Sequence, residues 1–176
     1  FKRVLESHPS TMLLLVPRHP ERFDAVATLV GRMGLRLGRR SKNDLLTAEM
    51  QVYLGDSMGE MMSYYRLASI AFVGGSLVNT GCQNVLEPAA FGIPVVTGPS
   101  QFNFATICRQ LEAESALRTV ANEKELADFL IDLIPDWARQ AEMGRRGKAL
   151  VEDNQDSLPA LLSLLEPLLA APSSDA

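Results

Sequence analysis

Six short apolar stretches alternate with polar or amphipathic segments along this 176-residue chain. A continuous apolar run, without alternation, is typical of a strand that is covered on both faces in a parallel sheet. Met12 to Val16 is such a run, and Pro17 closes it. The pattern predicts strands at 12–16, 35–38, 51–55, 69–73, 94–97 and 117–120.

Segments with apolar residues at helical spacing lie between these strands. In residues 21–33, for example, Phe23, Val26 and Val30 fall on one helical face. Alternating strands and helices predict an α/β fold with a doubly wound, six-stranded parallel sheet and right-handed crossovers. We expect a loop at 39–50 and helices at 1–8, 21–33, about 60–68, 84–91, 102–113, 122–133, 135–152 and 158–169, followed by a frayed tail at 172–176.

The segment that follows the fourth strand has the pattern of an anion site. Gly74 and Gly75 interrupt the apolar run, a polar loop follows, and a helix then begins. Asn84 suits the N-cap, and Glu87 is placed to reach back to the N–H of the capping residue. Free N–H groups at a helix N-terminus favour a phosphate. A structural role is the alternative, in which the glycines turn the chain and Glu87 only caps.

Four of the predicted strands end in unusual loops, at 17–18, 55–60, 74–87 and 98–103. The carboxyl ends of parallel strands lie on one edge of a sheet, where open α/β sheets bind their ligands. We therefore expect these four loops to open on one rim. Convergence of several loops is a better indication of a ligand site than any single motif.

Several side chains in these loops suit a nucleotide. Arg18 is a fixed cation for a phosphate or carboxylate, or else a member of a surface ion pair. His19 suits a hydrogen bond to a ligand or support of the turn. Met58 and Gly59 offer an apolar surface and close backbone approach to a planar group, unless Met58 belongs to the core.

Other polar residues of the same loops suit either a ligand contact or a structural role. Ser57 and Glu60 have the spacing of a capping box, which is the alternative to a ligand role for Glu60. Glu87 suits two hydroxyls of a ribose. Asn103 either orients a ligand or holds its loop. The expected supporting residues are His19, Ser57, Gly74, Gly75, Ser76 and Asn103.

The absence of known phosphate-binding motifs limits the class of ligand that the chain is expected to bind. It has neither a G-x-G-x-x-G sequence nor a P-loop lysine, so a site for one phosphate fits better than an extended phosphate cradle. A net charge of -4 argues against nucleic acid held by general electrostatics. Cys82 and Cys108 have no metal-ligand spacing with His8 or His19, so we expect no metal and no cofactor.

Composition and length indicate one globular domain, residues 1–176, with 47% hydrophobic and 22% charged residues. Two thiols without a disulfide framework fit a reducing compartment. No apolar run approaches the roughly 18 residues of a membrane span, and we find no signal peptide. The chain opens inside a helical pattern at Phe1, as we expect for a portion of a longer protein.

Five motifs, in order, closely resemble the carboxyl-terminal half of the 3-deoxy-D-manno-octulosonic acid (Kdo) transferases. The likeness runs from about residue 9 to residue 168. The motifs are residues 17–23, 55–60, 71–77, 84–90, and Gly98-Pro99 with 102–104.

This resemblance implies the Rossmann-like, CMP-sugar-binding half of a GT-B glycosyltransferase, with the acceptor domain absent from this chain. The enzyme would move Kdo from CMP-Kdo to a lipid A precursor in lipopolysaccharide biosynthesis, with inversion and without an essential metal. The family's general base lies in the absent domain, so no catalytic residue is named here and the fragment alone is expected to be inactive. The full enzyme is expected on the cytoplasmic face of the inner membrane of Gram-negative bacteria, with membrane contact only through the absent half.

The resemblance also implies the residues that hold the CMP group. We assign Arg18 and the N–H groups around Asn84 to the phosphate, Glu87 to the ribose, and Met58 with Gly59 to the cytosine. Where the family usually reads Gly-Gly-His-Asn, this chain has Gly81-Cys82-Gln83-Asn84. The expected CMP-binding residues are Pro17, Arg18, Met58, Gly59, Glu60, Asn84, Val85, Leu86 and Glu87.

Two other functions fit the same pattern. One is another GT-B glycosyltransferase, or a sugar-nucleotide epimerase, that uses a UDP-sugar. The absence of an added basic residue in the loop from Gly74 to Glu87, for a second phosphate, favours CMP over UDP. The other is a non-catalytic Rossmann-like module that docks a partner through its helices at 122–169.

Overall fold

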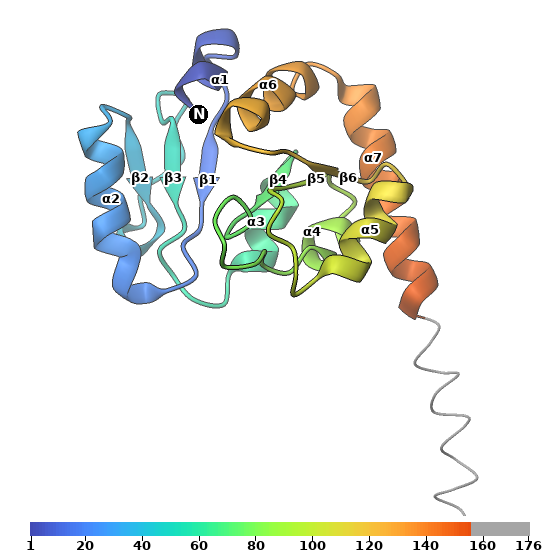
Figure 1. Cartoon of the computed structure of the whole chain (residues 1–176). Helices are drawn as coiled ribbons and strands as arrows, with labels where there is room; N and C mark the ends of the chain where they lie inside the picture. Colours follow the sequence, from blue (N-terminus) through green and yellow to red (C-terminus); the bar gives the residue numbers. More distant parts are fainter. Residues whose placement is uncertain (156–176) are drawn as a thin grey trace, which may run out of the picture.

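The computed structural model of the chain describes residues 1–155, and the helix expected at 158–169 and the tail at 172–176 lie outside them (Figure 1). All six predicted strands are present, each three residues long in its hydrogen-bonded part. They are β1 (Leu13–Leu15), β2 (Leu37–Arg39), β3 (Val52–Leu54), β4 (Ala71–Val73), β5 (Val95–Thr97) and β6 (Leu117–Thr119).

Every strand pairing is parallel, as predicted, but the six strands do not form one continuous ladder. They form two three-stranded sheets, in the orders β1-β3-β2 and β4-β5-β6. The expected single sheet is therefore corrected: β1 and β4 are edges in the described part of the chain. An apolar run specifies which residues are covered and not which strand edges pair, so the sequence pattern could not separate the two cases. Covering is also incomplete on β1, whose three residues are only half-buried.

The helices follow the predicted alternation with the strands. They are α1 (Lys2–Ser7), α2 (Phe23–Arg32), α3 (Met61–Leu67), α4 (Leu86–Ala90), α5 (Ala105–Ala113), α6 (Glu123–Leu133) and α7 (Trp137–Gln155), with short 3-10 helices η1 (Pro20–Arg22) and η2 (Arg40–Lys42). The central helix, α4, is shorter than the expected 84–91. The predicted loop at 39–50 contains η2.

The core around the second sheet explains the position of α4. Val73, Val85, Val95 and Leu117 are buried in one apolar cluster that joins β4, β5 and β6 to the start of α4. α4 also packs against α7. A Cβ at Gly144 of α7 would overlap the carbonyl oxygen of Gly92, so the missing side chain lets the two backbones meet closely. α4 is thereby held between the sheet and α7.

Helices connect the half of the described chain that contains β1, β2 and β3 with the half that contains β4, β5 and β6. α1 lies alongside α6 although the two are far apart in the sequence (Figure 1). Arg3 forms an ion pair with Asp128 at 2.5 Å. His8 Nε2 donates to the carbonyl oxygen of Ile131 at 2.9 Å. These contacts fix the first sheet to the second on the α1 side of the molecule.

Candidate functional site

The loop between β4 and α4 is closed by its own backbone. The N–H of Gln83 donates to the carbonyl oxygen of Gly74 at 3.1 Å. Gly75 has a φ of +82°, and a Cβ there would overlap the carbonyl oxygen of Gly81. Only glycine fits that position, since it needs both a left-handed backbone and the absence of a side chain. Gly74 and Gly75 therefore shape the loop.

Two polar side chains tie this loop to the one that follows β5. Ser76 is fully buried; its hydroxyl donates to Val73 O at 2.6 Å and accepts from the N–H of Gly98 at 2.7 Å. Asn103 Nδ2 donates to the carbonyl oxygen of Cys82 at 2.6 Å. Of the two roles considered for Asn103, this contact corresponds to holding the loop. The loops after β4 and β5 are thus one connected unit.

The start of α4 differs from the predicted capping box. Val85 already has helical backbone angles (φ −87°, ψ −17°) and occupies the N-cap position. Asn84 lies one residue earlier, and its Oδ1 accepts from the N–H of Leu86 at 3.0 Å, as in an Asx turn. Its Nδ2 donates to Glu87 Oε1 at 3.1 Å. Glu87 therefore contacts the side chain of Asn84 instead of a capping N–H.

This arrangement leaves part of Glu87 available. Within residues 1–155, Glu87 Oε2 has no hydrogen-bond donor. The side chains of Val85 and Leu86 belong to the core, since Val85 is fully buried and Leu86 packs against the same cluster. They contribute to the loop through their backbone. With five residues, α4 is too short for its dipole to define an anion site by itself.

Arg18 connects the first half of the chain to this loop. It follows β1 and Pro17, is exposed, and its Nη1 donates to Gln83 Oε1 at 3.0 Å. The described part of the chain contains no ion pair of Arg18, so the alternative of a surface ion pair is not what the structure contains. Three of the four predicted loops, those after β1, β4 and β5, therefore do meet on one rim.

His19 and Pro17 lie next to Arg18 but make weaker contacts. The side chain of His19 is exposed, and its Nδ1 lies 3.8 Å from Glu21 Oε1, within its own turn. Pro17 is half-buried between β1 and that turn. Of the two roles considered for His19, this contact corresponds to support of the turn.

The segment after β3 contains a second cluster of contacts. Glu60 Oε1 accepts from Arg40 at Nε (3.1 Å) and Nη2 (2.9 Å), and the Ser57 hydroxyl donates to Glu60 Oε2. Those bonds, from Ser57 first and then Arg40, lower the pKa of Glu60. The predicted capping box is therefore wrong: Glu60 is itself the N-cap position of α3, and Ser57 and Arg40 occupy its carboxylate.

Met58 and Gly59 are at the tip of that segment. Met58 is 67% exposed, so the alternative that places it in the core is excluded. Gly59 has a φ of +80°, and a Cβ there would meet no heavy atom of the described residues within 4 Å. The tip thus presents an open apolar surface beside bare backbone.

Asp56 anchors this cluster and was not among the predicted residues. It is buried, and its carboxylate accepts from Arg39 Nε (2.6 Å), the Ser41 N–H (2.8 Å) and the Ser41 hydroxyl (2.6 Å). Burial raises the pKa of Asp56, but the bonds from Ser41 and Arg39 outweigh it and the pKa is lowered. Asp56 thereby fixes the segment that contains Arg40. The available signal was the pair Arg39 and Arg40 at the end of β2, because Arg18 likewise lies at the end of a strand.

The cluster around Glu60 and the loops that contain Arg18 and Glu87 are connected by helix packing and not by polar contacts. Residues 1–155 contain no hydrogen bond or ion pair between Met58, Gly59 or Glu60 and either Arg18 or Glu87. Tyr65 of α3 packs on Phe91, with ring centroids 5.9 Å apart. Burial, and then the charge of Glu87, raise the pKa of Tyr65 to about 12. α3, which follows the Met58–Glu60 segment, therefore packs beside α4.

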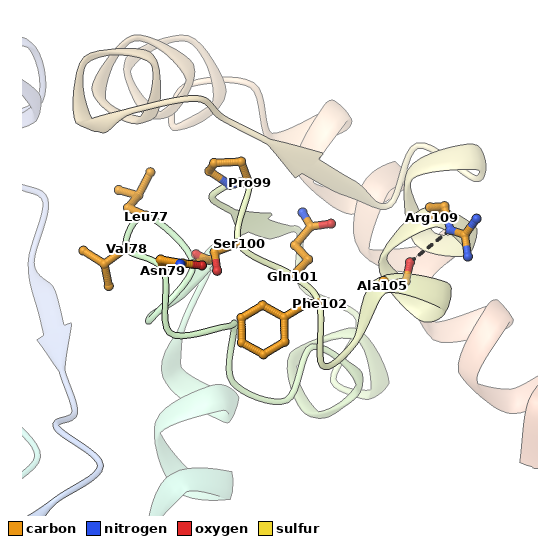
Figure 2. Close-up of a pocket in the computed structure, with 10 residues that line it drawn as sticks. Leu77, Val78, Asn79, Pro99, Ser100, Gln101, Phe102, Ala105 and Arg109 are labelled. Carbon is orange, nitrogen blue, oxygen red and sulfur yellow. Dashed lines mark hydrogen bonds between the residues drawn. The ribbon is translucent and has the colours of Figure 1, made fainter.

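A hollow of about 640 Å³ borders the loop, and most of its lining residues lie in the predicted loops 74–87 and 98–103 (Figure 2). Figure 2 shows Leu77, Val78 and Asn79 on one loop beside Pro99, Ser100, Gln101 and Phe102 on the next, with Arg109 farther away on α5. The Gly81 N–H donates to the Ser100 hydroxyl at 3.1 Å, which joins the hollow to the loop before α4. Phe102 and Val78 are exposed there.

The described residues include both cysteines of the chain. Cys82 and Cys108 are both fully buried. Burial raises the pKa of the Cys82 thiol, and it raises that of Cys108 to about 12. Among residues 1–155, no group of three or more His, Cys, Asp or Glu side chains is placed to hold a metal ion. In the same residues, no helix has the length and apolar character to cross a membrane.

Comparison with known proteins gives the class first. The family model described as "Glycosyl transferases group 1" matches residues 4–150. The chain therefore belongs to the group 1 glycosyl transferases. This membership favours a glycosyl transferase over the non-catalytic Rossmann-like module.

Within that class, the chain is similar to the 3-deoxy-D-manno-octulosonic acid transferases. The one from Haemophilus influenzae is 43% identical over 169 residues, which are 96% of this chain and 40% of that protein. The one from Bordetella pertussis is 35% identical over 159 residues, 90% of this chain and 37% of that protein. The resemblance seen in the five motifs is confirmed. The chain spans about two fifths of the length of these curated relatives.

A solved structure confirms the fold class. The C-terminal CMP-Kdo binding domain of WaaA from Acinetobacter baumannii is 35% identical, with a TM-score of 0.73. The match covers 81% of this chain and 76% of that chain. The chain thus has the α/β, Rossmann-like architecture of one half of a GT-B glycosyltransferase.

Proposed function

We propose that this chain is the donor-binding half of a Kdo transferase and that its strand-tip loops bind the CMP group of CMP-Kdo. One observation carries the proposal. Arg18, from one strand end, bonds Gln83 of the loop after another strand, and the next residue of that loop, Asn84, bonds Glu87. The similarity to a domain described as CMP-Kdo binding supports the same ligand.

The phosphate is assigned to the Arg18 end of these contacts and the ribose to the Glu87 end. A guanidinium has five N–H donors, and Arg18 uses one of them on Gln83, so others can pair with a phosphate oxygen. At the other end, Glu87 Oε2 can accept from a ribose hydroxyl while Oε1 stays with Asn84. The backbone around Asn84 completes the phosphate site.

The cytosine is assigned to the tip formed by Met58 and Gly59. A planar base can lie on the exposed methionine and against the backbone of the glycine. Glu60 fixes that tip, because its two carboxylate oxygens are occupied by Arg40 and Ser57. In this assignment Glu60 acts by positioning Met58 and Gly59.

The acceptor half of the reaction is proposed for sequence that this chain does not contain. The curated relatives are more than twice as long as the matched region. We assign to that further sequence the lipid A precursor, the general base and any membrane contact, on the cytoplasmic face of the inner membrane of a Gram-negative bacterium. Residues 1–176 are then one donor domain that binds CMP-Kdo and does not turn it over alone, without metal or cofactor.

Calorimetric titration of the chain with CMP, UDP and GDP tests the proposal. We expect saturable one-to-one binding of CMP and weaker binding of UDP and GDP. Glu87→Ala should weaken CMP by about tenfold, the equivalent of one hydrogen bond to a charged group. Glu152→Ala, on the surface of α7, is the control and should bind as the parent does.

Three outcomes would count against the proposal. A folded sample that binds no CMP at millimolar concentration would refute it. Tighter binding of UDP than of CMP would favour a UDP-sugar enzyme. An unchanged affinity after Glu87→Ala would leave Glu87 with a structural role beside Asn84.

A further inference from the structure

Gln83 contacts Arg18 at a place where the two halves of the molecule have little other polar contact. The bond from Arg18 Nη1 to Gln83 Oε1, at 3.0 Å, joins the loop after β1 to the loop before α4. In the described residues, the other side-chain hydrogen bonds between the halves belong to Arg3 of α1 and to His8, which follows α1. Gln83 therefore makes the polar link on the rim itself.

The backbone of Gln83 is well fixed, whereas the side chain of Arg18 is not. The Gln83 N–H is bound to Gly74 O at 3.1 Å, and the preceding carbonyl, that of Cys82, is bound to Asn103 Nδ2 at 2.6 Å. Arg18 is exposed on a loop, and an arginine side chain has many rotamers. Its bond to an anchored acceptor selects a small set of those rotamers.

We propose that Gln83 is a positioning residue that holds the Arg18 guanidinium toward the phosphate of the donor nucleotide. The inference rests on the proposed function. Gln83 suits this role because an amide accepts from arginine through its oxygen without adding a negative charge beside the phosphate. An arginine that is ordered before the ligand arrives loses less rotamer freedom on binding, which increases affinity.

A double-mutant cycle separates this role from a structural one. CMP affinity is measured for the parent chain, Gln83→Met, Arg18→Ala and the double variant. Methionine keeps the length of the side chain and removes the acceptor, and position 83 is exposed, so the fold should be retained. We expect Gln83→Met to weaken CMP about threefold to tenfold. In the Arg18→Ala background the same change should have no effect, since Gln83 acts through Arg18.

Cytidine, which lacks the phosphate, is the second probe. Its affinity should be the same for the parent and for Gln83→Met. Equal losses for CMP and cytidine, or a full loss in the Arg18→Ala background, would mean that Gln83 only shapes the loop and would overturn the proposal. Normal CMP binding by Gln83→Met would overturn it too and leave the proposed function standing. Failure of the parent chain to bind CMP would overturn both.

Discussion

Replacing Asp56 by alanine should destabilise the first half of the fold. The Asp56 side chain is completely buried, with three donors on its two oxygens: Arg39 Nε at 2.6 Å, the Ser41 N–H at 2.8 Å and the Ser41 hydroxyl at 2.6 Å. Its removal leaves these donors without their acceptor. It also frees the segment that holds Arg40 against Glu60.

The size of the effect follows from burial. Removing one partner of a buried ion pair costs about 3–5 kcal/mol. The Arg39 side chain keeps 18% exposure and a second carboxylate, Asp24, at 2.8 Å, so the low end of that range applies. We expect Asp56→Ala to lower the free energy of unfolding by about 3 kcal/mol.

Asp24→Ala is a matched control because it removes a carboxylate from the same guanidinium. The side chain of Asp24 is 89% exposed, and exposed pairs contribute about 0–1 kcal/mol. Urea unfolding followed by circular dichroism would measure both variants, with the slopes compared to verify two-state behaviour. A loss below about 1 kcal/mol for Asp56→Ala, or equal losses for the two variants, would refute the reasoning.

Three further predictions concern the loops and pH. Ser76→Ala should lower the free energy of unfolding by about 1–3 kcal/mol in a urea titration, because the buried Gly98 N–H loses its acceptor; an unchanged midpoint would contradict this. Gly59→Ala should lower the free energy of unfolding by about 1–2 kcal/mol, because residue 59 has a left-handed backbone. Gly75→Ala should lower it more, because a Cβ at Gly75 would also overlap a carbonyl oxygen, whereas one at Gly59 would not. Equal losses for the two variants would show that no overlap occurs. The pKa of Asp56 is lowered in the folded protein, so its carboxylate stabilises the fold at pH values above the unfolded pKa of about 3.9. This stabilisation is lost as the pH falls through the unfolded pKa and then through the folded pKa. Stability from pH 5 to pH 3 should therefore fall more steeply in the parent than in Asp56→Asn, and parallel curves would contradict the assignment.

The sequence predicted the elements of the fold well because apolar runs and helical spacing depend on burial, and burial is local to each element. Val52 to Leu54 and Val95 to Thr97 are buried strands, as their continuous apolar pattern indicates. Pairing between strands depends on backbone edges that side chains do not report. The break between β1 and β4 therefore could not be seen in the pattern.

The site was predicted as a set of loops but not as a set of contacts. Asn84 and Glu87 do interact, yet the angles of Val85 move the helix start and change which of their atoms meet. Glu60 pairs with Arg40, which lies twenty residues earlier in the chain and reaches it only because β2 and β3 are neighbours. Gln83 likewise contacts Arg18, which lies on a loop after a strand of the other sheet. Long-range contacts of this kind have no local signature.

A titration of the ¹⁵N-labelled chain with CMP, followed by amide chemical shifts, tests most directly whether separate strand tips bind one nucleotide. We expect the largest shifts together, with one dissociation constant, at Arg18, Gly59, Gln83 and Glu87, and small shifts on α6 and α7. Shifts confined to one of these loops, or an unchanged spectrum at millimolar CMP, would contradict a shared nucleotide site.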